Sequence, residues 1–203
     1  MNADCYHYPV THSASNTIPH NLATVFLDRD GVLNEKMPEG RYVTSSKDFH
    51  ILKGVPEAIA RLNNAGLRLV VVSNQRGIAL GLYTAADVDA IHSAFQRLLS
   101  AHGAHIDAFF ICPHDHDQCN CRKPLPGLFH QAIAQFPDIA AASSVMIGDS
   151  RLDIEFARRI GMTAILIDKQ PKQTNPGIDP AQAVADLRFP SLQEAVNALL
   201  ERR

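Results

Sequence analysis

The stretch Ala23-Thr-Val-Phe-Leu-Asp-Arg-Asp-Gly31 places two acidic side chains directly after a short apolar run. The apolar part, Ala23 to Leu27, is typical of a strand buried in a sheet. Gly31 permits a tight backbone turn, which can bring the carboxylates of Asp28 and Asp30 to one pocket. Two neighbouring carboxylates repel each other, so the pocket needs a cation or a shared proton. Mg²⁺ prefers oxygen ligands and suits such a pair.

Strand patterns alternate with helix patterns along the rest of the chain. Further buried strands are predicted at 67–72, 106–111, 144–147 and 163–167, and helices at 55–65, after Thr84, after Pro126, at 150–160 and after Ser191. This alternation predicts an α/β fold, a three-layer, Rossmann-like doubly wound parallel sheet. In such a sheet, functional residues lie just past the carboxyl ends of the strands.

Length and composition favour one globular domain. The chain has 203 residues, with 46% apolar residues, 20% charged residues and a formal net charge of −2. These values argue against a nucleic-acid groove and a polybasic membrane patch, and no apolar run reaches the ~20 residues of a membrane span. We expect a flexible tail at 1–21, a single domain at 22–203 and, since the first residues do not form a secretory signal, a cytoplasmic location.

Polar residues suited to phosphate chemistry follow several predicted strands. Ser73 and Asn74 follow the second strand, and Gly148-Asp149 ends the fourth. Asp149 can add a third carboxylate, while Ser73 and Lys123 offer a hydroxyl and an ammonium group for a phosphoryl group. A carboxylate can attack phosphorus, and a second carboxylate can move the proton. By itself the acidic pair also fits an ordinary turn; its occurrence with the other residues favours a phosphoryl-transfer site.

The loop at 112–121 predicts a second metal site. It contains three thiols and an imidazole within ten residues, Cys112, His114, Cys119 and Cys121. Four such ligands fill the tetrahedral shell of structural Zn²⁺. His116 competes with His114 as the fourth ligand, and free thiols beside a solvated histidine are the alternative. The loop runs directly into Arg122-Lys123, so a bound metal would fix the position of these cations.

These motifs together resemble the haloacid-dehalogenase superfamily of phosphatases. The resemblance rests on Asp28-x-Asp30-Gly31, Ser73, Lys123 and Gly148-Asp149-x-x-x-Asp153. It implies that Asp28 is the nucleophile and Asp30 the general acid/base. It also implies Mg²⁺ held by Asp28, the backbone carbonyl of Asp30, and Asp149, with Ser73 and Lys123 on the phosphoryl group. Asp153 fits a site residue and a helix cap equally well, and Arg29 fits a structural ion pair.

Longer motifs resemble the heptose-bisphosphate phosphatases within this superfamily. They are Asn74-Gln-x-Gly-Ile-Ala79, Cys112-Pro-His114 and Cys119-x-Cys-Arg-Lys-Pro124. The resemblance implies hydrolysis of a small phosphorylated sugar in lipopolysaccharide biosynthesis, with Asn74 and Arg122 among the residues that bind the substrate or its phosphate. Leu80 and Ser150 depart from the family, which usually carries cations there.

Other functions remain open within and beyond this family. Histidinol-phosphate phosphatases share the zinc loop, and a phosphotransferase or a non-catalytic zinc-binding module is the alternative from another class. The segment between Asn34 and Val55 is too short for a separate cap domain. We therefore expect a capless, monomeric enzyme with an open site and with no nucleic-acid or membrane partner.

Overall fold

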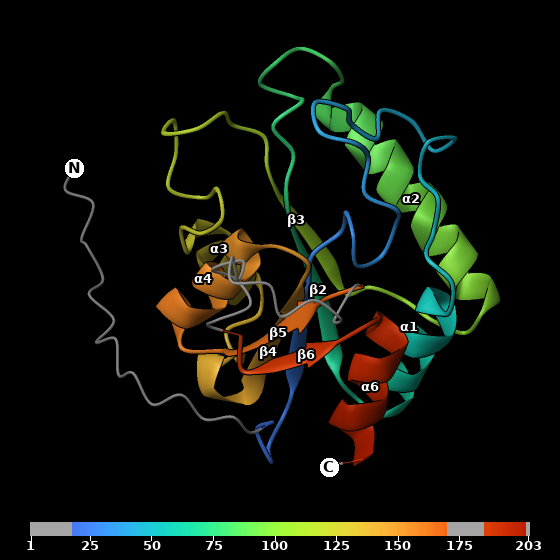
Figure 1. Cartoon of the computed structure of the whole chain (residues 1–203), viewed down its shortest axis with the longest axis vertical. Helices are drawn as coiled ribbons and strands as arrows, with labels where there is room; N and C mark the ends of the chain where they lie inside the picture. Colours follow the sequence, from blue (N-terminus) through green and yellow to red (C-terminus); the bar gives the residue numbers. More distant parts are fainter. Residues whose placement is uncertain (1–17, 170–184, 202–203) are drawn as a thin grey trace, which may run out of the picture.

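A parallel sheet forms the centre of the molecule. The computed structural model describes residues 18–169 and 185–201 (Figure 1). Within them, the six strands are β1 (Thr24–Leu27), β2 (Arg68–Asn74), β3 (Ala108–Cys112), β4 (Ser144–Gly148), β5 (Thr163–Ile167) and β6 (Leu187–Phe189). Every pairing between them is parallel, in the order β3-β2-β1-β4-β5-β6. The strand order reverses at β1, whose Leu27 aligns with Val71 of β2 and Ile147 of β4.

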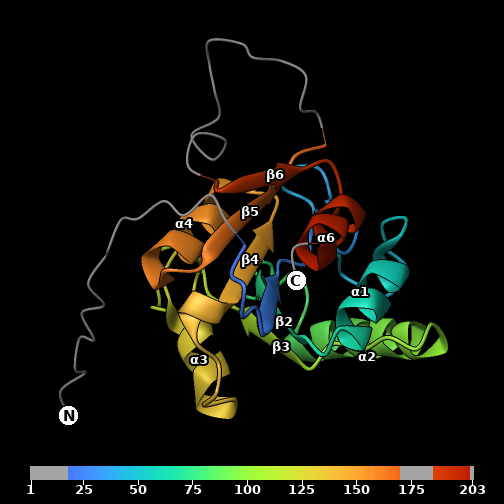
Figure 2. The same ribbon diagram turned by 90° about the horizontal axis from the view of Figure 1, so that it is seen from below.

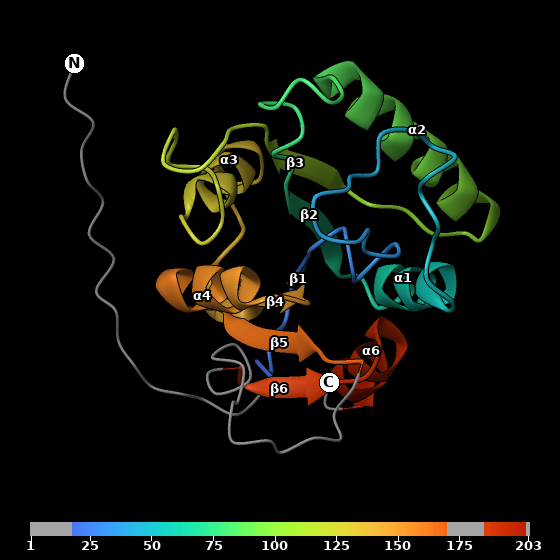
Figure 3. The same ribbon diagram turned by 45° about the horizontal axis from the view of Figure 1, so that its top comes forward.

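Helices cover both faces of this sheet. They are α1 (Val55–Asn64), α2 (Ala85–Ala101), α3 (Gly127–Gln135), α4 (Arg151–Ile160) and α6 (Leu192–Glu201), with a short 3₁₀ turn η1 (Ala141–Ser143) before β4. In Figures 2 and 3, α3 and α4 lie on one side of the sheet, and α1, α2 and α6 lie on the other. The predicted doubly wound α/β fold is confirmed.

Successive strand residues supply two separate apolar cores. Val25 and Leu27 of β1 are buried with side chains of α1, α2 and α6, whereas Phe26 between them is buried with side chains of α3 and α4. Neighbouring side chains on a strand point to opposite faces, so a strand with helices on both sides must be apolar throughout. This explains why β1 reads as a continuous apolar run.

Helix ends follow sequence signals. Thr84 and Asp87 form a reciprocal capping box at the start of α2, and Gly161 ends α4 with a φ of 86°, a left-handed conformation that favours glycine. Pro56 occupies the first turn of α1, where its missing N–H costs no helical hydrogen bond. These local signals account for the predicted helices, all of which are present.

Two expectations need correction. The five predicted strands are present, but β6 was not predicted because its three residues give no clear alternation. The predicted tail at 1–21 extends too far, since Ile18 is buried in the core with α1 and α6. Residues 1–17, which include Cys5, and most of the predicted loop at 168–180 lie outside the described residues.

In residues 18–169 and 185–201, no helix combines the length and the apolar character needed to cross a bilayer.

Candidate active site

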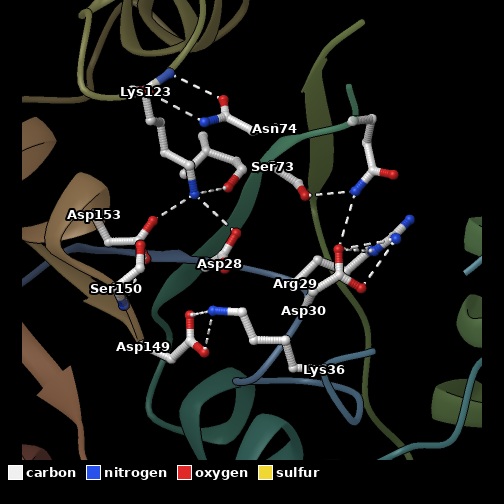
Figure 4. Close-up of polar contacts among 12 residues, drawn as sticks. Asp28, Arg29, Asp30, Lys36, Ser73, Asn74, Lys123, Asp149, Ser150 and Asp153 are labelled. Carbon is white, nitrogen blue, oxygen red and sulfur yellow. Dashed lines mark hydrogen bonds and ion pairs between the residues drawn. The ribbon is translucent and has the colours of Figure 1, made fainter. Parts of the chain in front are cut away.

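Three carboxylates meet where the strand order reverses. Asp28 follows β1 directly, Asp149 follows β4 directly, and Asp153 lies in the first turn of α4. Their nearest carboxylate oxygens lie within 4.8 Å of one another (Figure 4). Because β1 and β4 are parallel neighbours, their carboxyl ends bring the first two residues to the same edge of the sheet.

A buried lysine links this cluster. Lys123 Nζ donates to Asp28 Oδ1 at 2.8 Å, to Asp153 Oδ1 at 2.6 Å and to the carbonyl of Val72 at 2.8 Å. Only 3% of the Lys123 side chain is exposed, so its three ammonium protons are all directed to protein acceptors. These three hydrogen bonds therefore hold the ammonium group of Lys123 in one defined position within the cluster.

Burial and charge shift the pKa values of this group. Burial raises the pKa of Asp28 to about 7; the Lys123 ammonium opposes that rise, and the nearby Asp153 and Asp149 carboxylates add to it. Burial alone would lower the pKa of Lys123, but the carboxylates of Asp153 and Asp28 raise it overall. Lys123 therefore stays positively charged at neutral pH.

Asp149 has a second cation and a close glycine. Lys36 Nζ donates to both of its carboxylate oxygens, at 3.1 and 2.8 Å. Gly31 has a φ of +100°, and a Cβ there would lie 2.2 Å from Asp149 Oδ2. The glycine of the acidic motif thus supplies both the turn and the space that Asp149 occupies.

Asp30 is directed to a different set of donors. Its carboxylate accepts hydrogen bonds from the side chain of Arg29, from Asn34 Nδ2 at 3.0 Å and from Gln75 Nε2 at 3.1 Å. The carboxylate is not part of the three-residue cluster around Lys123. Arg29 is almost fully buried and pairs with Asp30, which agrees with the structural ion pair considered from the sequence.

Ser73 and Asn74 lie at the end of β2. The buried Ser73 hydroxyl accepts from Gln75 Nε2 at 2.8 Å. Asn74 Oδ1 accepts from the backbone N–H of Lys123 at 2.9 Å, and Asn74 Nδ2 donates to the Lys123 carbonyl at 3.1 Å. In this structure the amide of Asn74 holds the backbone of Lys123; its predicted contact with phosphate stays a prediction.

Arg122 offers an unused donor beside these residues. Its Nη1 is buried and has no hydrogen-bond partner among the described residues. A buried guanidinium N–H without an acceptor is costly, so this atom is suited to donate to a ligand oxygen.

Asp153 lies both in the helix cap and in the carboxylate cluster. Its Oδ2 accepts from the backbone N–H and the hydroxyl of Ser150 at the start of α4, at 3.1 and 2.6 Å, while its Oδ1 contacts Lys123. The cap thus fixes one oxygen and leaves the other in the cluster. Ser150, one of the two departures from the family, is part of this cap.

The four side chains of the Cys/His loop converge as well. The Sγ atoms of Cys112, Cys119 and Cys121 and Nδ1 of His114 lie within 4.8 Å of one another. The closest S–S separations are 3.3 and 3.5 Å, too long for a disulfide and close to the ~3.8 Å edge of a tetrahedron with Zn–S bonds of ~2.3 Å. His116, the competing ligand, is not in this group.

The chain is similar to known phosphatases in both sequence and fold. A family model described as HAD-hydrolase-like matches residues 120–194. The curated D-glycero-alpha-D-manno-heptose-1,7-bisphosphate 7-phosphatase of Mycobacterium tuberculosis is 38% identical over 171 residues, which is 84% of this chain and 87% of the relative. The chain belongs to the haloacid-dehalogenase-like (HAD) phosphatases.

Other HAD phosphatases support this assignment. The D-glycero-beta-D-manno-heptose-1,7-bisphosphate 7-phosphatase of Bordetella bronchiseptica is 40% identical over 147 residues, covering 72% of this chain and 80% of the relative. A crystal structure of the B. bronchiseptica D,D-heptose 1,7-bisphosphate phosphatase, complexed with magnesium and phosphate, superposes with a TM-score of 0.79 at 33% identity. That match covers 90% of this chain and 100% of the solved one.

Several residues of this HAD phosphatase site were not predicted from the sequence. Three side chains from loops contact the acidic residues. Lys36 contacts Asp149, and both Asn34 and Gln75 contact Asp30. Asn34 lies four residues after Asp30, and Gln75 two residues after Ser73, so proximity in sequence was an available signal for both. Lys36 lies 113 positions from Asp149 and gave no such signal.

Proposed function

We propose that this HAD phosphatase removes the 7-phosphate of D-glycero-D-manno-heptose 1,7-bisphosphate, in the formation of nucleotide-activated heptose for lipopolysaccharide. The observation that carries the proposal is the cluster of Asp28, Asp149 and Asp153 around Lys123, at the point where the strand order reverses. The substrate comes from the names of relatives that are 33–40% identical.

The chain's own residues support a two-step hydrolysis. A carboxylate oxygen of Asp28 attacks phosphorus, and the bond from phosphorus to the sugar oxygen breaks as Asp30 gives that oxygen a proton. Asp30 then takes a proton from water as the water oxygen bonds to phosphorus and the bond to Asp28 breaks. Two in-line displacements leave the configuration at phosphorus retained. Lys123 and Ser73 would stabilise the phosphoryl oxygens.

The acidic cluster fits Mg²⁺. All of its donors are carboxylate oxygens, which a hard divalent cation prefers. We assign the ion to Asp28, Asp149 and the backbone carbonyl of Asp30. Bound there, Mg²⁺ would neutralise negative charge on the phosphoryl oxygens.

The Cys/His loop fits structural Zn²⁺. Cys112, His114, Cys119 and Cys121 supply a complete tetrahedral set, which leaves no open position for chemistry. Cys121 is followed by Arg122 and Lys123, so the metal would hold the loop that delivers Lys123 to the carboxylates.

We also propose the domain organisation, oligomeric state and location of the enzyme. It is a capless monomer with a single catalytic domain, which includes Ile18 of the core as well as the predicted range 22–203. It acts in the cytoplasm on a small phosphorylated sugar. The short connection from Asn34 to Val55 supports the absence of a cap domain.

A substrate panel tests the proposed reaction. Both anomers of the heptose bisphosphate, histidinol phosphate and simple sugar phosphates would be compared by kcat/KM. We include both anomers because relatives named for the alpha and the beta compound are similarly close. A preference for histidinol phosphate would overturn the substrate assignment, and phosphorylation of an added alcohol in place of phosphate release would identify a transferase.

Replacing the nucleophile tests the covalent mechanism. Asp28→Asn should lower kcat by about 10⁴-fold or more, because the amide cannot form the acyl phosphate. Zinc content and the unfolding midpoint should change little. Asp138→Asn, in a surface ion pair with Arg68, is the matched control and should keep full activity. Substantial hydrolysis by Asp28→Asn would exclude the aspartyl-phosphate route.

A further inference from the structure

One buried amide joins two functional groups of the site. Gln75 follows β2 directly and is only 1% exposed. Its Nε2 donates to Asp30 Oδ2 at 3.1 Å and to Ser73 Oγ at 2.8 Å. Its Oε1 accepts from the Tyr83 hydroxyl at 2.7 Å. Gln75 therefore connects the proposed general acid/base with the proposed phosphoryl-binding hydroxyl.

The chemistry of the partners fixes which way this amide faces. Once Asp30 has given up its proton, its carboxylate can only accept hydrogen bonds, so the NH₂ group of Gln75 faces it. The amide oxygen then faces Tyr83, whose O–H completes its bonding. Burial raises the pKa of Tyr83 to about 12, so the phenol keeps its proton through neutral pH and remains a donor.

Tyr83 is itself held in place. Its ring packs so closely on Gly77 that a Cβ at that glycine would lie 2.1 Å from Tyr83 Cε1. The Tyr42 ring contacts it from another side, with centroids 6.0 Å apart. The backbone N–H of Gln75 is also bound, to the carbonyl of Cys112 at 2.8 Å. Both ends of the Tyr83–Gln75 contact are therefore anchored to the fold.

We propose that Tyr83 and Gln75 are positioning residues that aim the carboxyl group of Asp30 at the oxygen of the leaving group. The inference rests on the proposed role of Asp30 as general acid/base. Arg29 and Asn34 also hold Asp30, but only Gln75 among the described hydrogen bonds ties it to Ser73. The Tyr83 hydroxyl acts through Gln75 and does not touch the reacting atoms.

Leaving-group dependence provides the test. A sugar alkoxide must be protonated as it departs, whereas p-nitrophenolate leaves without a proton. The value of kcat/KM reports the first displacement. The leaving group departs in this step, so kcat/KM depends on whether that group needs a proton. Tyr83→Phe should lower kcat/KM about tenfold for the best sugar phosphate of the panel, and less than about twofold for p-nitrophenyl phosphate.

Two further variants complete the experiment. Gln75→Met keeps the length of the side chain, removes both of its donors, and should show the same selective loss to a greater extent. Tyr42→Phe removes a hydroxyl from the adjacent ring, where it interacts with Arg76, and should leave the ratio of the two kcat/KM values unchanged. Thermal unfolding of each variant separates misfolding from misalignment.

Asp30→Asn distinguishes this inference from the proposed function. If Asp30→Asn lowers kcat/KM equally for both substrates, the role of Asp30 as acid is wrong. If Asp30→Asn is selective but folded Tyr83→Phe and Gln75→Met are not, the positioning role is overturned and the proposed function stands. Selective loss in all three variants supports both.

Discussion

Gly31 shows how one residue serves both the backbone and the site. Its φ of +100° is unfavourable for other residues, and its missing Cβ leaves the space in which Asp149 lies. The glycine after the two acids is therefore required by the position of a side chain from another strand. This close approach explains why the acidic motif and Asp149 form a single site.

Gly31→Ala should impair both folding and metal binding. We expect a loss of about 1–3 kcal/mol in the free energy of unfolding and weaker Mg²⁺ binding, because the new methyl group displaces Asp149. Urea unfolding and titration calorimetry measure the two effects. Gly40→Ala is the control, since Gly40 has a φ of +78° and open space at its Cβ. Equal effects of the two substitutions on Mg²⁺ affinity would contradict the explanation.

Lys36 should compete with the proposed metal ion. Its ammonium group lies on both oxygens of Asp149, and its side chain is 55% exposed, so the electrostatic effect is modest. Lys36→Gln should raise the affinity for Mg²⁺ about three- to tenfold in calorimetry without substrate. Lys47→Gln, an exposed lysine in the same segment, should leave it unchanged. Weaker binding by Lys36→Gln would show that the lysine assists the metal site.

The residues that the sequence predicted share a local signal. Asp28, Ser73 and Asp149 each come at the end of an apolar run, and the strand pattern alone places them at one edge of the sheet. Lys36 and Tyr83 lie in loops, where side-chain direction depends on distant partners such as Asp149 and Gln75. No periodicity encodes these contacts, so only the folded structure shows them.

At the scale of elements, the packing of α2 on β3 buries a histidine. His92 of α2 stacks on Phe109 of β3, with ring centroids 4.2 Å apart and an interplanar angle of 17°. Its Nε2 is buried without a hydrogen-bond partner among the described residues. Burial lowers the pKa of His92 to about 3; Arg29 lowers it further, and Asp30 opposes the shift. The fold therefore contains this imidazole in its neutral form.

This burial should make the fold sensitive to acid. In the unfolded chain His92 takes up a proton near pH 6.5, while in the folded chain it remains neutral down to about pH 3. The unfolded state thus gains protons first, and stability is lost as the pH falls below 6.5, by about 2 kcal/mol at pH 5. His92→Phe, which keeps a stacked ring, should remove that part of the loss in urea unfolding at pH 7 and pH 5. An unchanged pH dependence would contradict the assignment.

Some helices and strands could be predicted from their own sequences, whereas strand β6 could not. The strands β1, β2, β4 and β5 are apolar on both faces, and α2 and α4 carry capping signals, so each was predictable from local pattern. Strand β6 has three partly exposed residues at the edge of the sheet, next to β5. Its pairing depends on that neighbour and not on a pattern of its own.

At the scale of the whole molecule, the Cys/His loop connects distant parts of the site. Asp115 of this loop forms an ion pair with Arg76, which follows β2, and the loop continues into Lys123. Asn74 then binds the backbone of Lys123 on both sides. The loop thus fastens the end of β3 to the residues after β2 and to the carboxylate cluster.

Removing the proposed zinc ion should therefore affect both stability and catalysis. A strong chelator should lower the unfolding midpoint by roughly 5–10 °C, about 2–4 kcal/mol for a domain of this size, and reduce kcat. His114→Ala should lower zinc content measured by atomic absorption, while His116→Ala, outside the cluster, should not. Full zinc content in His114→Ala would show that the ligand set is wrong.

The charges around Lys123 have a kinetic consequence. When Asp28, Asp149 and Asp153 are ionised, they face the ammonium groups of Lys123 and Lys36, which leaves one negative charge uncompensated. A phosphate dianion approaching this surface is repelled until a divalent cation reverses the sign. The two ligands should accordingly bind in a compulsory order, the cation before the sugar phosphate. Calorimetry should detect binding of inorganic phosphate only when Mg²⁺ is present.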